Sequence, residues 1–597
     1  MTSDVNNLSR RSILRAMTAL AGAAALPALG AHRARAAMPD LPPNFGKGRS
    51  VAIVGGGVAG LTAGWKLANA GFNVTVYEAN DRYGGRSLTP RPERAEYREW
   101  WFSKYNPHKL FPEMYVSSYH EVSPSPVTQT QTCRFDDPAW NPHSGQPPVE
   151  LFLNAGPGRI PSDHVALIEL CLKTGVALEP YIFQSNYNLL QSPKFRGGAP
   201  IAYNQVNYSL KGQVAELLAK QIATEQPSEH RTKMLDMLQQ FGDLNDKDDF
   251  TGSTRLGYSD YPGGWRTPGK VKPVVPLDQT LDSGFVGGGN PELSPGSFLF
   301  NADNLDWQNS LMQPVGGMDR VWQRLLVQDV PATAVRPRSD DPRARALAAR
   351  RGGQHYVGDL VLLNHQVTSI IDDDKANKIT VDYVWKDPAT GKTGHGRDIA
   401  DFCFSSMAPN LLAKLETNLS ADFRKALGDV DQTHAFKVGW QAKSRFWQKE
   451  NNIYGGISWT DDIIGQIWYP SEDFNAGTGV LTGAYNRGTV ATEFGKWDQA
   501  ARIKAALAGG AKLHPGFADK VFADKGLTIA WQYMPFQVGG WPSDTANTQP
   551  AVYEAITDLP QGRLYLAGDA WSYLPGWQEG AITSVYAAID ALAHKIG

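Results

Sequence analysis

Three glycines and one glutamate near the start of the chain have the types and spacing that bind a dinucleotide. Gly55, Gly57 and Gly60 follow an apolar run at 51–54, and Glu78 ends a second apolar run about 20 residues later. Glycine permits the tight turn, the approach of the backbone to a pyrophosphate and the close packing of helix on strand. The N–H groups and dipole of that helix N-terminus attract phosphate, and the acid would bond a ribose hydroxyl. This context favours a dinucleotide site over an ordinary glycine turn.

Two more stretches extend this site. Residues 78–86 read Glu-Ala-Asn-Asp-Arg-Tyr-Gly-Gly-Arg, and a Gly-Asp pair follows a strand-like run near the other end of the chain. Together with Pro-Gly-Trp-Gln-Glu-Gly-Ala at 575–581, they resemble the flavin-containing amine oxidase family. The resemblance implies FAD, bound non-covalently because the flavin-attaching cysteine of monoamine oxidases is missing from this C-terminal run. It assigns the cofactor to Gly55, Gly57, Gly60, Glu78, Arg82, Gly85, Arg86, Gly158, Val367, Trp531, Gly568, Asp569 and Gly580.

The resemblance runs from about residue 48 to the end of the chain. It is strongest toward bacterial L-amino-acid oxidases, L-lysine oxidase/monooxygenases and tryptophan 2-monooxygenase. Arg159 lies in a Gly-Pro-Gly-Arg-Ile-Pro stretch at 156–161 that is similar to the family's substrate loop. There an arginine grips the substrate carboxylate, a task that suits a planar fork binding both oxygens. A surface arginine beside a turn is the alternative.

Five other residues are implied to complete the substrate site. Tyr469 would give the carboxylate a second hydrogen bond, and Lys437 would hold a water near flavin N5 and assist reoxidation by O2. A strand lysine paired with a surface acid is the alternative for Lys437. The pocket walls are expected to be Trp468, Trp541 and Trp577. Buried core tryptophans would look the same in sequence.

These residues predict an FAD-dependent L-amino-acid oxidase, which converts an L-α-amino acid to a 2-oxo acid, NH3 and H2O2 by hydride transfer from Cα to flavin N5. One alternative is an L-amino-acid 2-monooxygenase, which decarboxylates its substrate to an amide. Another is a monoamine or polyamine oxidase, which needs no carboxylate partner. A non-enzymatic flavoprotein is disfavoured by Arg159, Lys437 and Trp577. Ala570-Trp571 departs from the His or Glu of many relatives, so aromatic, aliphatic and cationic substrate side chains all stay open.

Composition limits the remaining classes. A chain of 597 residues exceeds one hydrophobic core, and its 42% hydrophobic and 20% charged residues are typical of soluble proteins. The net charge of −2 argues against a nucleic-acid partner. Cys133, Cys171 and Cys403 are too far apart for a disulfide framework or a metal motif, so we expect buried thiols and no metal. The resemblance also allows a homodimer.

The first 37 residues read as an export signal. Ser-Arg-Arg-Ser-Ile-Leu-Arg at 9–15 matches a twin-arginine motif, a mildly apolar stretch follows at 16–31, and Ala34-Arg35-Ala36 supplies small residues for cleavage. The stretch is too short and too rich in Ala and Gly to span a membrane. The chain is therefore expected to use the twin-arginine translocation machinery and to become periplasmic or secreted, without a membrane anchor after processing.

The mature chain is predicted to be α/β (α+β). It should combine a discontinuous Rossmann-like FAD-binding domain, a mixed-sheet substrate-binding domain and an inserted helical region, which together make the amine oxidase fold. Strand-like runs are expected at 360–363, 367–370 and 379–384, and helices between 163 and 238. The expected parts are 1–37 (signal peptide), 48–135 (FAD-binding), 150–312 (substrate loop and helical region), 313–415 (FAD-binding), 430–545 (substrate-binding) and 555–597 (FAD-binding).

Two stretches are predicted to lack regular structure. Residues 90–150 are rich in Pro, Tyr, Trp and His and read as a long irregular excursion. Residues 330–353 carry three prolines and six arginines. A solvated, protease-sensitive loop is favoured there over a nucleic-acid patch, because acidic residues interrupt the charge and aromatic residues are missing.

Overall fold

The computed structural model describes most of the chain beyond the predicted signal peptide. Residues 39–597 form one compact unit. The predicted signal peptide and residues 336–352 of the arginine-rich loop lie outside the described residues. The structure describes residues 41–122, 128–286, 298–300, 303, 311–335, 353–543, 548–557 and 561–597.

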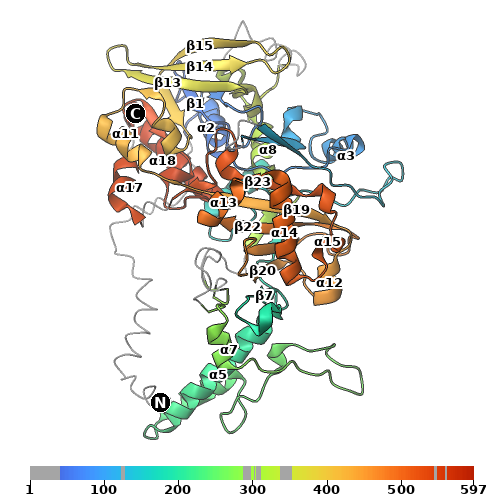
Figure 1. Cartoon of the computed structure of the whole chain (residues 1–597). Coiled ribbons are helices and arrows are strands. Elements are labelled where there is room, and N and C mark those ends of the chain that lie inside the picture. The colour runs from blue at the N-terminus through green and yellow to red at the C-terminus, as the bar shows by residue number, and fades with distance from the viewer. Residues whose placement is uncertain are drawn as a thin grey trace. The chain divides into compact units, whose positions relative to one another are not determined.

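A five-stranded parallel sheet forms the base of the cofactor domain (Figure 1). Its strands lie in the order β12-β2-β1-β16-β25, so three stretches far apart in the sequence meet in one sheet. This is the discontinuous Rossmann-like arrangement that the sequence predicts. The strands are β1 (Ser50–Val54), β2 (Asn73–Tyr77), β12 (Val361–Leu362), β16 (Phe402–Ser405) and β25 (Leu564–Leu566).

Both faces of this sheet are covered, which is why its strands consist mostly of apolar residues. Helices α2 (Val58–Asn69) and α18 (Gln578–Ile596) pack against each other. Helix α2 lies on the Ile53 face of the sheet, where a Cβ on Gly64 would be 3.8 Å from the Ile53 side chain. On the other face, Ala52 packs in a core with residues of a four-stranded sheet. That sheet comprises β13 (His365–Asp373), β14 (Lys378–Lys386), β15 (Thr393–Ala400) and β17 (Glu416–Thr417).

A seven-stranded mixed sheet forms the second domain, in the order β23-β19-β22-β21-β20-β7-β8. Neighbouring strands are antiparallel except β20 and β7. Helices α12 (Phe446–Asn451), α13 (Thr489–Gly495), α14 (Gln499–Leu513) and α15 (Phe517–Lys520) accompany it. Its strands are β7 (Leu189–Gln191), β8 (Ile201–Ala202), β19 (Ala435–Ala442), β20 (Gly456–Thr460), β21 (Gln466–Tyr469), β22 (Gly479–Arg487) and β23 (Leu527–Ala530).

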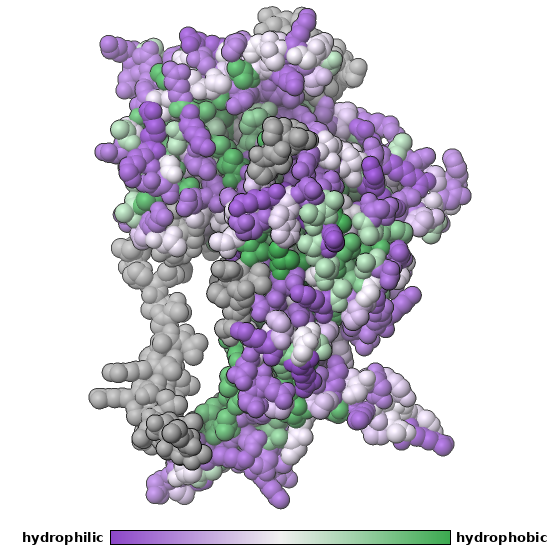
Figure 2. Space-filling model, viewed as in Figure 1, coloured by the Kyte–Doolittle hydropathy of each residue, from purple (hydrophilic) through white to green (hydrophobic). Residues whose placement is uncertain are grey.

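The inserted helical region is a hairpin of two helices. Helices α5 (Tyr203–Ala223) and α6 (Glu229–Gly242) pack through small and apolar residues that include Ala215 and Leu238. Several apolar side chains of these helices are exposed, among them Leu217 and Met237. Figure 2 shows hydrophobic residues gathered over the part of the molecule where Figure 1 places α5 and α7. Helix α4 (Val165–Thr174) precedes the hairpin and α7 (Leu277–Asp282) follows it.

The prediction for residues 90–150 was wrong in part. The stretch contains α3 (Ala95–Tyr105), whose buried Tyr97 and Trp101 are one helical turn apart, and a hairpin of β3 and β4. All three cysteines are buried, as predicted. The other elements are β3 (Ser118–Val122), β4 (Thr128–Thr132), β5 (Ile160–Pro161), β6 (Leu178–Tyr181), β9 (Leu311–Pro314), α8 (Arg320–Leu326), β10 (Asp329–Val330), β11 (His355–Tyr356), α10 (Pro409–Leu412), α11 (Ala421–Gly428), β18 (Gln432–Thr433), β24 (Trp541–Pro542) and α17 (Pro550–Thr557).

Candidate active site

The glycine loop between β1 and α2 has the geometry of a phosphate cradle. Gly55 has φ +107°, a backbone conformation that side chains rarely allow. A Cβ on Gly60 would lie 1.8 Å from the Gly55 carbonyl oxygen, so the helix can approach the strand only with glycine there. A Cβ on Gly57 would meet nothing within 4 Å, and this residue lines a cavity at the N-terminus of α2. Gly60 itself does not line the cavity; it acts by packing.

Glu78 is held at the end of β2 by two backbone N–H groups. Gly56 N donates to its Oε2 at 2.7 Å, and Asn80 N donates to its Oε1 at 2.8 Å. Burial raises the pKa of this carboxyl, against the opposing effect of the two hydrogen bonds and of Arg82. The side chain lines the same cavity as the glycine loop. A carboxylate fixed at this position can accept hydrogen bonds from a ribose.

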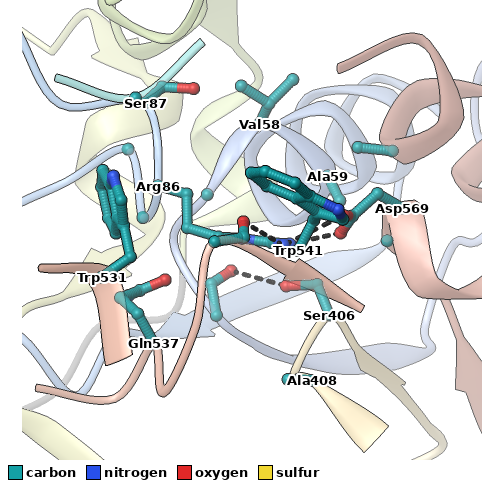
Figure 3. A pocket seen from close by; sticks show the side chains of 18 of the residues that line it. Val58, Ala59, Arg86, Ser87, Ser406, Ala408, Trp531, Gln537, Trp541 and Asp569 are labelled. Carbon is teal, nitrogen blue, oxygen red and sulfur yellow. Dashed lines mark hydrogen bonds and ion pairs between the residues drawn. The ribbon is translucent and has the colours of Figure 1, made fainter. Parts of the chain in front are cut away.

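The two arginines of the 78–86 stretch have different positions. Arg82 does not line the main cavity; its Nη1 donates to the Gly85 carbonyl at 2.6 Å and so supports the glycine turn from behind. Arg86 lines the cavity and forms an ion pair with Asp569, with Nη1 at 3.0 Å from Oδ2. Figure 3 shows Arg86 extending between Trp531 and Trp541 toward Asp569. This ion pair joins the N-terminal and C-terminal parts of the cofactor domain at the cavity.

One continuous cavity of about 590 Å³ brings most of the predicted residues together. It begins at the glycine loop and ends between the large mixed sheet and the start of α18. Of the predicted residues, those that line it are Gly55, Gly57, Glu78, Gly85, Arg86, Gly158, Arg159, Val367, Lys437, Trp468, Trp531, Trp541, Gly568, Asp569 and Trp577. Those that do not are Gly60, Arg82, Tyr469 and Gly580.

Helix α18 begins at the cavity, but Gly580 faces the opposite way. A Cβ on Gly580 would lie 2.3 Å from the Leu574 carbonyl oxygen, so this glycine permits a turn to pack on the helix rather than contacting a cofactor. Gln578, the first residue of the helix, lines the cavity. Asp569 accepts a hydrogen bond from Gly576 N at 2.9 Å, which fastens the turn before the helix.

Arg159 is the cation at the substrate end of the cavity. It precedes β5, which pairs with β9 through Ile160 and Met312, and only 6% of its surface is exposed. Its guanidinium carbon lies 5.2 Å from the ring centre of Trp468, 5.7 Å from that of Trp577 and 5.3 Å from that of Phe183. Three aromatic rings hold the guanidinium by cation–π contacts. Arg159 also lines the cavity. A buried, aromatic-lined guanidinium is suited to binding a carboxylate.

Lys437 lies beside this cage on β19. Its Nζ donates to the carbonyls of Asn154 at 2.8 Å and Gly156 at 2.6 Å, and it lies 4.5 Å from the Trp468 ring centre. Burial, with a smaller contribution from Arg159, lowers the pKa of Lys437 to about 7. The alternative of a strand lysine paired with a surface acid does not fit, because this amine is 3% exposed and bonds backbone carbonyls.

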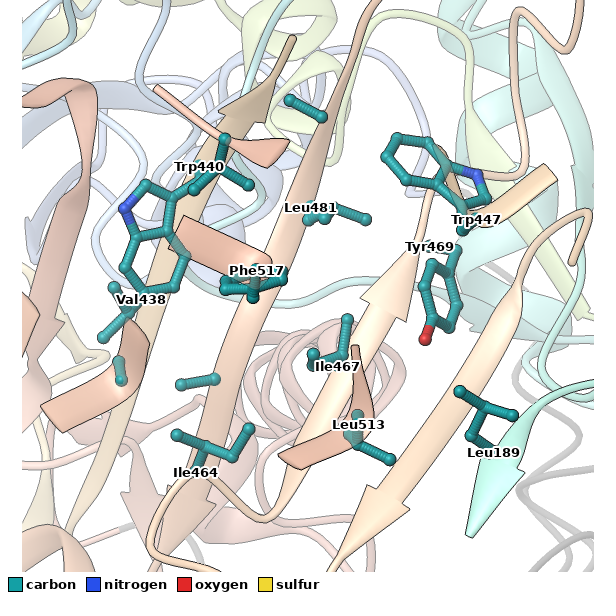
Figure 4. Packing of buried hydrophobic residues seen from close by; sticks show 14 of the residues in the cluster. Leu189, Val438, Trp440, Trp447, Ile464, Ile467, Tyr469, Leu481, Leu513 and Phe517 are labelled. Atoms are coloured by element: carbon teal, nitrogen blue, oxygen red, sulfur yellow. The ribbon is translucent and has the colours of Figure 1, made fainter. Parts of the chain in front are cut away.

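Tyr469 is not in the cavity, contrary to the prediction. Its hydroxyl lies 2.8 Å from Ser458 Oγ and 2.6 Å from His514 Nε2, inside the core of the mixed sheet. Figure 4 shows its ring among buried residues near Trp447. Successive side chains of a strand point to opposite faces, and Trp468 takes the cavity face of β21.

Tyr485, which lies beside Lys437, is a tyrosine that does line the cavity. It pairs with Lys437 across β19 and β22, and the Lys437 amine lies 5.4 Å from its ring centre. Burial raises the pKa of its phenol, so the group stays a neutral hydrogen-bond donor. Arg487 follows on the same strand and also lines the cavity. The alternation of β22 was the available signal, since positions two apart share a face.

One buried polar atom on the cavity wall fits a bound dinucleotide. Gln578 Oε1 has no hydrogen-bond partner among the described residues, and Gln578 lines the cavity. Buried polar groups normally have partners, so this acceptor fits a polar ligand such as FAD.

The comparisons with known proteins agree with this geometry. The family described as flavin containing amine oxidoreductase matches residues 276–590, and the NAD(P)-binding Rossmann-like domain matches residues 53–116. The chain belongs to the flavin-containing amine oxidoreductase family. Its cofactor is therefore FAD, as predicted, and its reaction class is the flavin-dependent oxidation of an amine.

Individual relatives are distant but cover nearly the whole chain. L-amino acid oxidase bordonein-L from Crotalus durissus terrificus is 24% identical over 547 residues, which are 90% of this chain and 85% of the relative. Flavin-dependent L-tryptophan oxidase RebO from Lentzea aerocolonigenes is 23% identical over 553 residues, 91% of this chain and 98% of the relative. The solved structure of cyclohexylamine oxidase from Brevibacterium oxydans IH-35A has a TM-score of 0.50 at 15% identity, covering 92% of this chain and 99% of that one.

Two features are absent from the described residues. No helix in the described part of the chain is long and apolar enough to cross a membrane. Within the same residues, no group of three or more His, Cys, Asp or Glu side chains could hold a metal ion.

Proposed function

We propose that this flavoprotein is an L-amino-acid oxidase, which converts an L-α-amino acid, O2 and water into a 2-oxo acid, ammonia and hydrogen peroxide. The single observation that carries the proposal is Arg159, a buried guanidinium inside an aromatic cage at the substrate end of the cavity. Oxidation of a simple amine needs no such group, whereas an amino acid brings a carboxylate that needs a buried counter-ion. The family relationship supports the amine chemistry.

The lining residues divide the task of binding. The substrate carboxylate takes two hydrogen bonds from Arg159 and a third from the Tyr485 hydroxyl, in place of the predicted Tyr469. The α-amine must be neutral for its nitrogen lone pair to assist, and walls such as Trp468 and Trp577 favour the uncharged amine by excluding water. FAD supplies the acceptor, at N5, for the hydride that leaves Cα.

Lys437 is placed to act on the oxidative half of the reaction. Two of its N–H bonds go to the carbonyls of Asn154 and Gly156, and its lowered pKa makes the neutral amine accessible near pH 7. In that form the nitrogen keeps a lone pair, so it can accept a proton or a hydrogen bond from a water in the cavity. We therefore keep the predicted role of Lys437 in water binding and O2 reactivity.

An L-amino-acid 2-monooxygenase is the second candidate. It would use the same carboxylate grip on Arg159 and would differ only in the product, an amide formed with loss of CO2. Product analysis separates the two activities, because the oxidase yields hydrogen peroxide and a 2-oxo acid in equal amounts.

The deciding experiment is a peroxide assay on the purified holoenzyme. The common L-amino acids and their decarboxylated amines are compared pair by pair, and anaerobic bleaching of the flavin is followed with the same compounds. We expect amino acids to bleach the flavin and produce peroxide, and the matching amines to be poor substrates. Equal rates for an amino acid and its amine would contradict the proposal.

We further propose that the enzyme is exported through the twin-arginine machinery and acts in the periplasm or outside the cell. The Arg10-Arg11 motif, the mild apolar stretch and the small residues before position 37 support this. A reporter fused to residues 1–40 should be exported, and replacing both arginines by lysine should retain it in the cytoplasm. Export of the lysine variant would contradict the assignment.

A homodimer remains a prediction. The exposed apolar side chains of α5 and α6, such as Leu217 and Met237, supply a surface that a second copy could cover. Light scattering of the purified protein measures this directly.

A further inference from the structure

A second arginine lines the substrate end of the cavity. Arg487 is the last residue of β22, two positions after Tyr485, and therefore projects from the same face of the sheet. Across the sheet, Tyr485 pairs with Lys437 and Arg487 pairs with Ala435. Tyr485 and Arg487 therefore lie one after the other on this face of β22, and Tyr485 belongs to the proposed carboxylate site.

No described residue balances the charge of Arg487 with an ion pair. Among the described residues, no hydrogen bond or ion pair joins its guanidinium to a carboxylate. The acidic residues that line the cavity are Glu78 and Asp569, and both are engaged elsewhere, the first by backbone N–H groups and the second by Arg86. Among the described residues, the substrate end of the cavity therefore offers cations to a ligand, and no unpaired acidic side chain lines it.

Two arginines that line one cavity with the same tyrosine suit a ligand with two anionic groups. Arg159 and Arg487 both lie within electrostatic reach of the Tyr485 phenol. Two residues of a strand span about 7 Å, which sets the distance between the Cα atoms of Tyr485 and Arg487. A substrate held by Arg159 and Tyr485 would direct a short acidic side chain toward Arg487.

We propose that the preferred substrates are L-amino acids with an acidic side chain, of the aspartate and glutamate type. Arg159 binds the α-carboxylate and Arg487 binds the side-chain carboxylate; the inference rests on the proposed amino-acid oxidase activity. A cationic side chain has no counter-ion at this end of the cavity, and a neutral one leaves Arg487 without a partner. Arg487 is exposed, so the pair would be weakened by salt.

The test compares L-glutamate with L-glutamine and L-aspartate with L-asparagine, because each pair differs in charge and hardly in shape. For the wild-type holoenzyme we expect kcat/KM for the acid to exceed that for the amide by about 10-fold or more at low salt. Raising the ionic strength should shrink that ratio, since a partly exposed charge pair is screened.

Arg487→Gln should reduce the acid-to-amide ratio to near one, and Arg487→Lys should keep part of it, because lysine retains the charge without the planar fork. Lys443→Gln is the matched control, an exposed cation just past the other end of β19 and outside the cavity lining, and it should leave the ratio unchanged. Flavin absorbance and thermal unfolding verify that each variant is folded and loaded.

Two results would overturn the inference and can be told apart from failure of the proposed function. Oxidation of neutral or cationic amino acids with no preference for the acids would refute the role of Arg487 without affecting the oxidase proposal. An unchanged acid-to-amide ratio in Arg487→Gln would also refute that role alone. Oxidation of no amino acid at all would refute the proposed function itself.

Discussion

Replacing Arg159 by methionine isolates the carboxylate grip from the rest of the cavity. Methionine is unbranched and polarizable, and it can occupy the space between Phe183, Trp468 and Trp577 with favourable sulfur–aromatic contacts. The cage should therefore persist and the flavin should stay bound. What disappears is the planar fork that makes two charge-assisted hydrogen bonds.

The size of the effect follows from those bonds. Each hydrogen bond to a charged group contributes about 1.5–3 kcal/mol, so losing two weakens binding of the carboxylate by about 3–6 kcal/mol. That corresponds to a fall in kcat/KM of about 10² to 10⁴ for an L-amino acid. The decarboxylated amine never used these bonds, so its kcat/KM should change by less than about 3-fold.

The assay is peroxide release by wild type, Arg159→Met and Arg159→Lys with an amino acid and its amine in parallel. Arg159→Lys should fall between the other two, because lysine supplies a point charge and no fork. Equal losses on amino acid and amine would mean that Arg159 only supports the fold of the cage. No loss on the amino acid would refute the carboxylate assignment outright.

Two further predictions concern the cofactor cradle and the buried lysine. Glu78→Gln places an amide N–H against one of the backbone N–H groups of Gly56 and Asn80, so FAD affinity should fall by about 10- to 100-fold. Flavin fluorescence on dilution measures this affinity. Asp81→Asn, at an exposed position, is the control and should leave the affinity unchanged. Burial lowers the pKa of Lys437 from 10.5 to about 7, so its charge destabilises the folded state fully below pH 7, and that penalty shrinks as the pH rises toward 10.5. Thermal unfolding in matched buffers measures this effect. Between about pH 7 and pH 9, the free energy of unfolding of wild type should rise by about 2 kcal/mol relative to that of Lys437→Met. A difference between the two proteins that does not change with pH would contradict the shifted pKa.

The parts of the site that could be predicted from the sequence are those that depend on neighbouring residues. The turn at Gly55, the close packing at Gly60 and the acid at Glu78 depend on a few neighbouring residues, so one short stretch specifies strand, turn, helix and the dinucleotide between them. The same holds for the Asp569 turn and the helix that begins at Gln578. These stretches also carried the family resemblance that implied FAD.

The errors arose where a residue's role depends on which way it faces. Tyr469 and Trp468 are neighbours on β21, and every residue of that strand is buried. A strand buried on both faces shows no polar–apolar alternation, so its sequence does not reveal which residue faces the cavity. Gly580 likewise was expected at the cofactor, but the α18 backbone turns it toward Leu574.

The chain by itself determined that a flavin cradle forms and that an arginine suited to a carboxylate lies on the loop at 156–161. Only the tertiary structure decided that Tyr485 rather than Tyr469 lines the cavity together with that arginine, and that Arg487 lines it as well. The reason is that cavity membership depends on strand register across β19, β21 and β22, which is set by pairing between residues 14 to 52 positions apart. Long-range pairing leaves no local signature in the sequence.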